Sequence, residues 1–227
     1  MTTTLITGAN RGLGLETARR LLAAGHTVYV GARDEARGRP VAEELGARFV
    51  QLDVTDDASV ARAFARLEAE DGLDVLVNNA GIAKYALNGS DALAVFDTNA
   101  VGIIRTTEAA LPLLRRSANP VVVNVSSALG SFTANHDPAR PASQFAAIVY
   151  GASKAAVSML TVQYARAVPE VKFNAVEPGY TATGLGDVDH SAGQPVEVGA
   201  EVIARWAGIG TDGPTGTFQE QAGVLGW

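Results

Sequence analysis

Tyr150 and Lys154 lie four residues apart near the start of an apolar, alanine-rich segment. In a helix this spacing places both side chains on one face. To exchange a proton near neutral pH, the tyrosine must lower its pKa from about 10 to about 7, which requires about 4 kcal/mol. An ammonium group about 4 Å away supplies about that amount at an effective dielectric constant near 20. The pair therefore indicates a tyrosine that acts as a general acid or base. The alternative is that the two residues form the polar edge of an amphipathic helix.

The elements that must position this pair follow from the hydrophobic pattern, in which short apolar strands alternate with amphipathic helices. Seven strands are predicted, over residues 3–7, 27–32, 49–52, 73–77, 121–125, 171–176 and 217–220. Helices are predicted over residues 15–24, 35–45, 57–70, 90–116, 150–167 and 196–209. The alternation predicts an α/β fold, a Rossmann-type doubly wound and mostly parallel seven-stranded sheet with helices on both faces. Residues 1–227 are expected to form a single domain.

Three segments do not follow the regular pattern. Asn99 lies within the predicted helix 90–116, where asparagine is unfavourable, so it either faces solvent or is a buried polar group accommodated by a local kink. Residues 129–145 have no clear period and contain Pro138 and Pro141, which predicts a surface loop. Residues 184–195 are rich in glycine and aspartate and could form a lid over a pocket.

A glycine-rich turn follows the first predicted strand. Residues 7–14 read TGANRGLG, with Gly8, Gly12 and Gly14 directly before a predicted helix. Such glycines let the backbone approach a pyrophosphate, whose charge is met by the amides at the helix N-terminus. Because the spacing differs from G-x-G-x-x-G, the alternative is that the glycines serve only a tight turn.

The residues after the second strand indicate which dinucleotide would bind. Asp34 lies about where an acidic residue would hold the ribose hydroxyl of NAD, whereas Arg33 could pair with the 2′-phosphate of NADP. An acid for the ribose would stand at the end of the strand, where Ala32 lies, and Asp34 suits the N-cap of the next helix. Arg11 adds a positive charge within the glycine turn. These residues favour NADP(H) over NAD(H).

Small and polar residues follow the other predicted parallel strands, at the edge of the sheet where ligands bind in open α/β folds. They are Asp53 and Val54 after 49–52, Asn78, Asn79, Ala80 and Gly81 after 73–77, Ser126 and Ser127 after 121–125, and Pro178, Gly179, Thr181 and Thr183 after 171–176. Two of these positions have a purely structural alternative. Asp53 could cap the chain from Thr55 onward, and adjacent asparagines are common turn formers.

Composition argues against several classes of function. The 227 residues suffice for one α/β domain with a full core, and a net charge of −6 argues against a nucleic-acid or anionic-membrane surface. The absence of cysteine excludes disulfides, iron–sulfur clusters and thiol catalysis, and three scattered histidines argue against a zinc site. No apolar run reaches the length of a membrane span and no basic leader precedes the first strand, so a soluble, cytoplasmic protein is expected.

Together these motifs resemble those of the short-chain dehydrogenase/reductase family, and the resemblance covers essentially the whole chain. The motifs are TGxxxGxG at residues 7–14, Asp53-Val54, Asn78-Asn79-Ala80-Gly81, Asn99, Ser126-Ser127, Tyr150-x-x-x-Lys154, and Pro178-Gly179 with Thr183. Each motif alone is modest evidence. Seven motifs in the order of the family make the resemblance specific.

The resemblance implies roles for Asn99, Ser127, Tyr150 and Lys154 as a catalytic tetrad. Tyr150 would protonate the carbonyl oxygen as hydride arrives from the nicotinamide, and would act as the base in the reverse direction. Lys154 would hold the nicotinamide ribose and lower the pKa of Tyr150. Ser127 would hydrogen-bond the substrate oxygen, and Asn99 would hold a water that relays protons to Lys154. The cofactor would contact Gly8, Asn10, Arg11, Gly12, Leu13, Gly14, Arg33, Asp53, Val54, Asn79, Ala80, Gly81, Tyr150, Lys154, Pro178, Gly179, Thr181 and Thr183.

Within the family, the details resemble the carbonyl reductases. Arg11 and Arg33 resemble their NADPH-selecting pair, and the 22 residues between Ser127 and Tyr150 resemble an insertion that hinders subunit pairing, so monomer and homo-oligomer both stay open. The expected function is NADPH-dependent reduction of a small-molecule aldehyde, ketone or quinone to an alcohol, or the reverse. The alternative is a non-catalytic, redox-sensing regulator that binds NADP(H), and the intact pair of Tyr150 and Lys154 argues against it.

Overall fold

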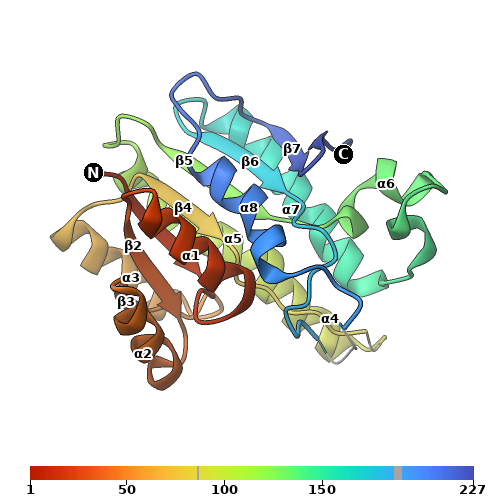
Figure 1. The fold of residues 1–227 in the computed structure, drawn as a ribbon, viewed down its shortest axis with the longest axis horizontal. Coiled ribbons are helices and arrows are strands. Elements are labelled where there is room, and N and C mark those ends of the chain that lie inside the picture. Colours follow the sequence, from red (N-terminus) through yellow and green to blue (C-terminus); the bar gives the residue numbers. More distant parts are fainter. Residues whose placement is uncertain (86, 187–190) are drawn as a thin grey trace.

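A single sheet forms the centre of the computed structural model, which describes residues 1–85, 87–186 and 191–227 (Figure 1). Within these residues the strands are β1 (Thr3–Thr7), β2 (Thr27–Ala32), β3 (Arg48–Gln51), β4 (Val75–Asn78), β5 (Val121–Val125), β6 (Lys172–Val176), β7 (Thr217–Glu220) and β8 (Gly223–Val224). They lie in the order β3-β2-β1-β4-β5-β6-β7-β8. All neighbours pair in parallel except β7 and β8. The mostly parallel sheet is therefore confirmed, with one short antiparallel strand more than the seven predicted, because the chain turns back after Glu220.

Helices connect the strands and cover both faces of the sheet (Figure 1). They are α1 (Gly12–Ala23), α2 (Glu35–Leu45), α3 (Asp57–Glu70), α4 (Gly89–Phe96), α5 (Gly102–Leu114), α6 (Phe132–His136), α7 (Ile148–Ala167) and α8 (Val196–Ala207). In the described part of the chain, three short turns have other helical types: η1 (Asp97–Val101), η2 (Ala128–Gly130) and η3 (Pro141–Gln144). Five of the six predicted helices are thus reproduced to within a few residues at their ends, and the sixth, predicted over 90–116, is divided.

Two hydrophobic cores lie on opposite faces of the sheet, because successive side chains of a strand point to opposite sides. Leu5 of β1 packs in one core with Leu67 of α3 and Leu111 of α5. Its neighbour Ile6 packs in the other with Ile203 of α8. All five side chains are buried. Strands covered on both sides in this way account for the nearly continuous apolar runs of the central strands.

The strand order creates the place where the candidate site lies. The chain builds β1, β2 and β3 outward and then returns to place β4 on the other side of β1. The connections that leave β1 and β4 therefore run in opposite directions, which opens a crevice beyond the carboxyl ends of these strands. The polar residues predicted at the ends of parallel strands are thereby gathered at one edge of the sheet.

Three segments differ in detail from the structure predicted for them. The helix predicted over 90–116 is divided by the π-helical turn η1, which contains Asn99, so the alternative of a buried asparagine at a local kink applies. Residues 129–145, predicted as a surface loop, contain α6 and η3, because Ser131 caps α6 through the amide of Ala134 and Pro141 starts η3. The lid predicted over 184–195 includes residues 187–190, which lie outside the described part of the chain.

Candidate active site

Tyr150 and Lys154 lie in the first two turns of α7, and both are buried. Lys154 Nζ is 5.6 Å from the centroid of the Tyr150 ring. It donates a hydrogen bond of 2.7 Å to the carbonyl oxygen of Val125, the last residue of β5. The two side chains therefore share one face of the helix, and the lysine reaches the carboxyl edge of the sheet.

Burial dominates the ionisation of this pair. Loss of hydration raises the pKa of Tyr150 above its usual value, the charges of Glu177 and Tyr85 raise it further, and a hydrogen bond with Ser127 opposes the rise. Burial lowers the pKa of Lys154 to about 8, against the opposing effect of Glu177. The pKa of Tyr150 is therefore raised, and the prediction that it is lowered is wrong. The ammonium group bonds a main-chain carbonyl, and burial favours the neutral phenol.

The adjacent serines after β5 have different surroundings. Ser126 Oγ is buried and donates a 3.2 Å hydrogen bond to the carbonyl oxygen of Lys154. Ser127 begins the turn η2, where its Oγ accepts a 3.2 Å hydrogen bond from the amide of Leu129. Ser127 also lies close enough to Tyr150 to oppose the rise in the pKa of its phenol. The structure thus brings Ser127 to the tyrosine, whereas Ser126 joins β5 to the backbone of α7.

Close packing of η2 on α7 holds Ser127 in this place. A Cβ atom at Gly130 would lie 2.4 Å from the carbonyl carbon of Lys154 and 2.6 Å from the amide nitrogen of Ala155. A Cβ atom at Gly151 would lie 2.9 Å from the carbonyl oxygen of Leu129. Contacts this short with main-chain atoms exclude a side chain at either glycine. The two glycines therefore set how closely the turn approaches the helix.

Asn99 joins three segments of the chain next to Lys154. Its Oδ1 accepts a hydrogen bond from the amide of Ile82 at 2.8 Å, and its Nδ2 donates to the Ile82 carbonyl at 2.9 Å and to Ser153 Oγ at 3.0 Å. Both N–H donors of the amide are thus used. A Cβ atom at Gly81 would lie 3.3 Å from Asn99 Oδ1 and 3.8 Å from Lys154 Nζ. The asparagine therefore fixes the chain after β4 against η1 and α7.

The glycine turn after β1 packs on the residues that follow β4. Gly8 has φ +65°, and a Cβ atom there would lie 2.9 Å from Ala80 Cα. A Cβ atom at Gly14 would lie 2.5 Å from Asn79 Nδ2. Asn79 Nδ2 donates hydrogen bonds to the carbonyl oxygens of Thr7 and Gly8, at 2.8 and 3.1 Å. Two segments predicted to bind the cofactor therefore form one surface at the crevice.

The N-terminus of α1 is suited to an anion. Helices α2 and α3 begin after Asp34 and Asp56, whose carboxylates accept hydrogen bonds from amides of the first turn. Arg11, which occupies the same position before α1 and follows Asn10 in the turn, carries only donors. The first amides of α1 therefore remain available to another acceptor, and the helix dipole favours a negative group there. The residues present fit a dinucleotide pyrophosphate.

The loop after β6 returns to the same turn. It contains the predicted cofactor residues Pro178, Gly179, Thr181 and Thr183. A Cβ atom at Gly12 would lie 3.5 Å from Thr183 Cβ. A Cβ atom at Gly199, in α8, would lie 2.6 Å from Thr181 Oγ1 and 2.8 Å from Leu13 Cδ2. The start of α1, the loop after β6 and α8 thus meet on one side of the crevice.

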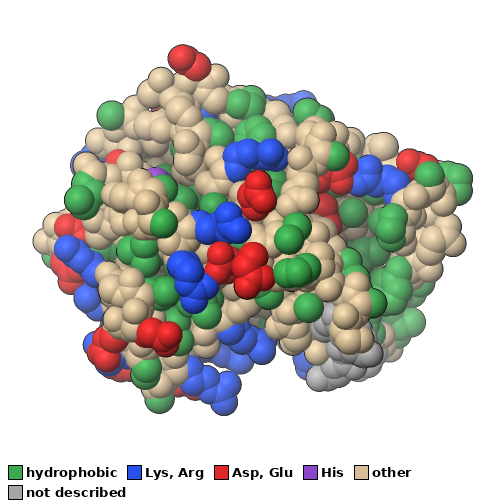
Figure 2. Space-filling model, viewed as in Figure 1, with side chains coloured by type: hydrophobic (Ala, Val, Ile, Leu, Met, Phe, Trp, Pro, Cys, Tyr) green, Lys and Arg blue, Asp and Glu red, His purple; other side chains and the backbone are tan. Residues whose placement is uncertain are grey.

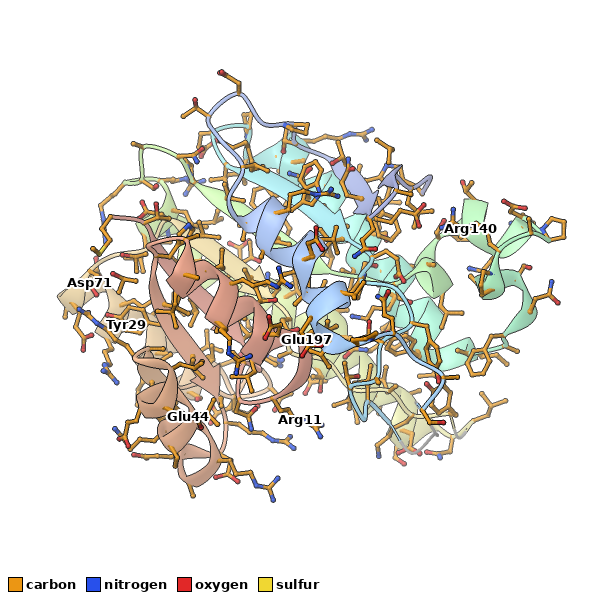
Figure 3. All side chains as sticks on the ribbon, viewed as in Figure 1. Arg11, Tyr29, Glu44, Asp71, Arg140 and Glu197 are labelled. Carbon is orange, nitrogen blue, oxygen red and sulfur yellow. The ribbon has the colours of Figure 1, made fainter. Side chains whose placement is uncertain are left out.

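Two exposed arginines lie beyond the ends of β1 and β2. Arg11 extends outward beyond the start of α1 (Figure 3). Arg33 follows β2, and its carbonyl oxygen accepts a hydrogen bond from Gln51. Asp34 accepts a 3.2 Å hydrogen bond from the amide of Arg37 and pairs with the side chain of the same arginine. Asp34 therefore caps α2 as predicted.

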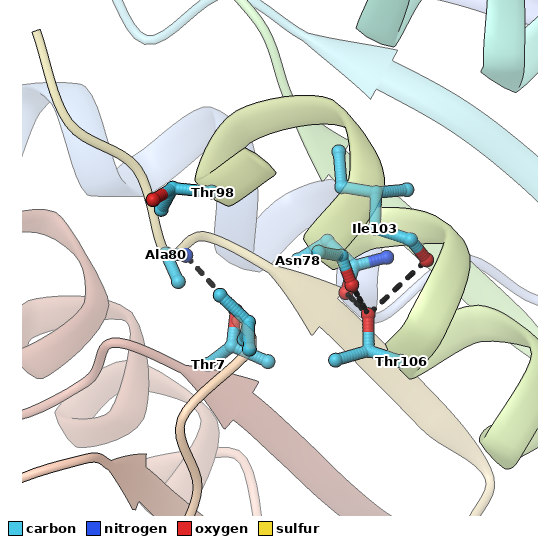
Figure 4. Close-up of a pocket in the computed structure, with 8 residues that line it drawn as sticks. Thr7, Asn78, Ala80, Thr98, Ile103 and Thr106 are labelled. Atoms are coloured by element: carbon cyan, nitrogen blue, oxygen red, sulfur yellow. Dashed lines mark hydrogen bonds between the residues drawn. The ribbon is translucent and has the colours of Figure 1, made fainter. Parts of the chain in front are cut away.

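Val54 and Ala80 line one small cavity beyond the ends of β1 and β4 (Figure 4). The other lining residues are Thr7, Asn78, Thr98, Gly102, Ile103 and Thr106. Thr7 Oγ1 accepts a 2.9 Å hydrogen bond from the amide of Ala80 (Figure 4). Asp53 Oδ1 accepts hydrogen bonds from the amide and hydroxyl of Thr55, at 2.9 and 2.7 Å. The capping role considered for Asp53 is therefore present.

Tyr150 belongs to a cluster of uncharged side chains. It packs with Ala83 and Ala147, and with the partly buried Tyr85, Leu129 and Leu185. The rings of Tyr85 and Phe145 make an edge-to-face contact with centroids 6.0 Å apart. A hollow of about 270 Å³ next to this cluster is lined by Leu129, Asn135, Phe145, Ala146, Ala147, Ile148, Gly151 and Ala152. These surroundings favour an uncharged ligand.

Comparison with known proteins identifies the family. The sequence profile described as short chain dehydrogenase matches residues 2–192 of the chain. The chain belongs to the short-chain dehydrogenase family. This agrees with the fold and with the order of the motifs along the sequence.

Individual relatives of this short-chain dehydrogenase support the same assignment. It is 34% identical over 246 residues to a short-chain dehydrogenase/reductase of Stachybotrys chlorohalonatus, covering 97% of this chain and 88% of the relative. It is 37% identical over 214 residues to the cis-4-hydroxycyclohexanecarboxylate dehydrogenase of Sinomonas cyclohexanicum, covering 88% and 80%. Its structure matches NADPH-bound carbonyl reductase from chicken fatty liver with a TM-score of 0.87, at 28% identity, covering 100% and 99%. Within the family, the protein is carbonyl-reductase-like.

Further features of this short-chain dehydrogenase concern its surface and possible metal ligands. In the described part of the chain, no group of three or more His, Cys, Asp or Glu side chains is placed to hold a metal ion. Among the same residues, no helix is long and apolar enough to cross a membrane.

Charged side chains of both signs are interspersed on the face that α1 and α8 form, where Glu16 pairs with Arg20 (Figure 2).

Glu177 and Gln194 hold the loops of the site in this short-chain dehydrogenase, and neither was predicted from the sequence. The carboxylate of Glu177 accepts hydrogen bonds from the amides of Ala128 and Gly179. Gln194 Nε2 donates to Thr181 Oγ1 at 3.3 Å, and a Cβ atom at Gly179 would lie 2.5 Å from the same nitrogen. An acid directly after a buried strand is a signal that could have indicated Glu177. The role of Gln194 depends on the folding back of its loop, which no local pattern indicates.

Proposed function

We propose that this short-chain dehydrogenase is an NADP(H)-dependent oxidoreductase that reduces the carbonyl group of a small molecule to an alcohol, or catalyses the reverse reaction. The observation that carries the proposal is the meeting of Tyr150, Lys154 and Ser127 next to the glycine turn, to which they are linked through Ala80 and Gly81. The dehydrogenase relative and the resemblance to an NADPH-bound carbonyl reductase support the same reaction class.

The protein's part in the reaction would be to supply and recover a proton; a nicotinamide cofactor, when bound, would provide the hydride chemistry. Tyr150 would donate its phenolic proton to the carbonyl oxygen during reduction and would remove the alcohol proton during oxidation. Ser127, which lies close enough to the phenol to affect its pKa, would bind the same substrate oxygen. Because burial raises the pKa of Tyr150, the phenol holds its proton at neutral pH, which is the state that reduction requires.

Lys154 and Asn99 would support this proton transfer from the sheet side. Lys154, with a pKa of about 8, is mostly charged at neutral pH and would hold the nicotinamide ribose. The amide of Asn99 is engaged with Ile82 and Ser153, so its side chain acts by fixing the backbone beside the lysine. The water that Asn99 is expected to hold stays a prediction.

Arg11 and Arg33 support a preference for NADP(H). Both guanidinium groups are exposed beyond the ends of neighbouring parallel strands, and the planar guanidinium group suits a phosphate. Ala32 occupies the end of β2, where an acid for the ribose of NAD would stand, and Asp34 is engaged in capping α2. The 2′-phosphate would therefore meet positive charge, whereas the unmodified ribose would lack an acidic partner.

The substrate class follows from the side chains near Tyr150. Ala83, Ala147, Leu129 and Tyr85 pack with the tyrosine, and Phe145 contacts the ring of Tyr85. A charged substrate group would lose its hydration there without gaining a partner of opposite sign. We therefore infer an uncharged aldehyde, ketone or quinone.

Consumption of NADPH and, separately, NADH by the purified protein tests the proposal against a panel of uncharged aldehydes, ketones and quinones. Tyr150→Phe is the variant that must lose turnover. Tyr164→Phe is a matched control, because Tyr164 lies on the same helix but hydrogen-bonds Glu108 away from the site. Turnover that survives in Tyr150→Phe would refute the assigned acid. Cofactor binding without turnover of any panel member would favour the alternative of a redox-sensing regulator.

A further inference from the structure

Glu177 is a buried carboxylate directly after β6, and it joins two loops of the candidate site. One carboxylate oxygen accepts a hydrogen bond from the amide of Ala128, in η2, and the other accepts from the amide of Gly179 at 2.9 Å. Only 9% of the residue is exposed. The carboxylate thus connects the turn that begins at Ser127 with the loop that carries Pro178.

The register of the sheet brings Glu177 close to the proton-transferring pair. Val125 of β5 pairs with Val176 of β6, the residue before Glu177. Lys154 Nζ hydrogen-bonds the carbonyl oxygen of Val125. Electrostatic interactions accordingly couple Glu177 to Lys154 and raise the pKa of Tyr150.

Other charged groups also face this carboxylate. Glu220 of β7 lies close enough to raise the pKa of Glu177, and Arg140 pairs with Glu220 and interacts with Glu177. Burial is the largest influence and raises the pKa of Glu177 to about 7, while hydrogen bonds from Ala128 and Gly179 and the charge of Lys154 oppose the rise. The group is therefore able to change its charge within the pH range in which enzymes commonly work.

We propose that Glu177 is a positioning residue for the proton-transferring pair. It holds the loops after β5 and β6 together, and its negative charge keeps Lys154 charged and Tyr150 in the phenol form. Since the phenol is the proton donor for carbonyl reduction, Glu177 biases the site toward reduction. This inference rests on the proposed function for its catalytic consequence, but not for the coupling of charges.

A purely structural role for Glu177 predicts a different outcome from an electrostatic one. Glu177→Gln removes the charge and places an NH₂ group against one of the two amides, so it disturbs both roles. Glu177→Asp keeps the charge with a shorter side chain, so it disturbs mainly the loop contacts. A structural role requires both variants to lose activity equally at every pH, whereas an electrostatic role requires only the glutamine variant to change the ionisation of its neighbours.

The first experiment measures the electrostatic coupling between Glu177 and Lys154 by titration, without enzymatic turnover. The chain has three lysines, Lys84, Lys154 and Lys172, so NMR of protein labelled at lysine Cε gives few signals, which Lys84→Arg and Lys172→Arg assign. In Glu177→Gln the pKa of Lys154 should fall by about one pH unit, the size expected for loss of a nearby opposite charge. In Glu177→Asp it should stay close to the wild-type value. An unchanged Lys154 titration in the glutamine variant overturns the inference.

The reciprocal measurement follows the titration of Glu177 in a Lys154 variant, so the coupling can be tested even if Glu177→Gln does not fold. By linkage, Lys154→Met should raise the pKa of Glu177 by as much as Glu177→Gln lowers that of Lys154. NMR of protein labelled at glutamate Cδ follows this titration, and comparison with Glu177→Asp assigns the signal. A Glu177 signal that titrates alike with and without the lysine overturns the coupling.

The second experiment measures the catalytic consequence in both directions. In Glu177→Gln, the loss of reductase activity at alkaline pH should begin about one pH unit lower, and alcohol oxidation should begin at a correspondingly lower pH. Glu170→Gln, at an exposed residue paired with Arg115, controls for the change in net charge. If Glu177→Gln is active and its pH–activity profiles are unshifted, Glu177 does not bias the site toward reduction, whereas the proposed function stands. Absence of turnover in the wild type refutes the proposed function, and the lysine titration then decides the coupling alone.

Discussion

The buried carboxyl group of Glu177 makes a pH-dependent contribution to stability that can be worked out from its surroundings. Burial raises its pKa from an ordinary value of 4.5 to about 7. The native state therefore binds this proton more tightly than the unfolded state does. The associated stability is fully present below about pH 4.5 and is lost as the pH rises through about 7. A difference of about 2.5 pH units corresponds to about 3 kcal/mol at 25 °C.

Glu177→Gln removes this pH dependence, because glutamine does not titrate. The variant also changes the hydrogen bonds to Ala128 and Gly179, which lowers its stability by an amount that does not depend on pH. The free energy of unfolding of the variant relative to the wild type should nevertheless rise by about 3 kcal/mol between pH 4.5 and pH 8. Loss of the charge also lowers the pKa of Lys154, which changes the difference in the same direction.

Urea unfolding of both proteins at intervals from pH 4.5 to pH 8 measures this slope, with circular dichroism as the readout. Glu170→Gln, which removes a charge from an exposed residue, should follow the wild type closely. The decisive quantity is how the difference in the free energy of unfolding between the two proteins changes with pH. A difference that is the same at every pH reflects only the changed hydrogen bonds. Parallel curves for wild type and Glu177→Gln would show that Glu177 is ionised in the native state across this range, and would refute the argument from burial.

Three further variants test the candidate site. Tyr150→Phe should bind NADPH with unchanged affinity by fluorescence titration but lower turnover by at least about 100-fold, because the general acid is lost; tighter or weaker binding would assign the hydroxyl a role in cofactor binding instead. Arg33→Asp should lower the ratio of NADPH to NADH affinity by about 10-fold or more, since a charge-assisted hydrogen bond contributes about 1.5–3 kcal/mol. An unchanged ratio would remove Arg33 from cofactor selection. Gly14→Ala would place a Cβ atom 2.5 Å from Asn79 Nδ2 and 2.9 Å from main-chain atoms, so it should lower the melting temperature and weaken cofactor binding, and a calorimetric trace like that of the wild type would contradict this packing.

The elements of the fold were largely predictable because each depends on local pattern. Apolar runs marked the parallel strands, since strands buried on both faces carry few polar residues. The N-cap of α2 at Asp34 followed from the side-chain chemistry of aspartate. The short helices between Ser131 and Gln144 were missed, because helices of one turn carry too few residues to show a period.

The candidate site was predictable as a set of residues but not in its electrostatics. The spacing of Tyr150 and Lys154 indicates a shared helix face, and it says nothing about the direction of the lysine side chain. In the structure the ammonium group bonds the end of β5, and burial raises the pKa of the tyrosine where the spacing alone suggested a lowered one. The sign of the shift depends on hydration, which only the packing of the whole chain determines.

The sequence by itself determined the fold class, the family and the order of the motifs, because strand and helix periodicity, glycine turns and residue spacing are properties of neighbouring residues. The tertiary structure alone decided which distant groups meet. It placed Glu177, directly after β6, where its charge acts on Tyr150 and Lys154 of α7. Amides from two loops donate hydrogen bonds to its carboxylate, and all three residues are buried. Charges interact strongly only when they are close and poorly hydrated, and both conditions arise when the chain has folded.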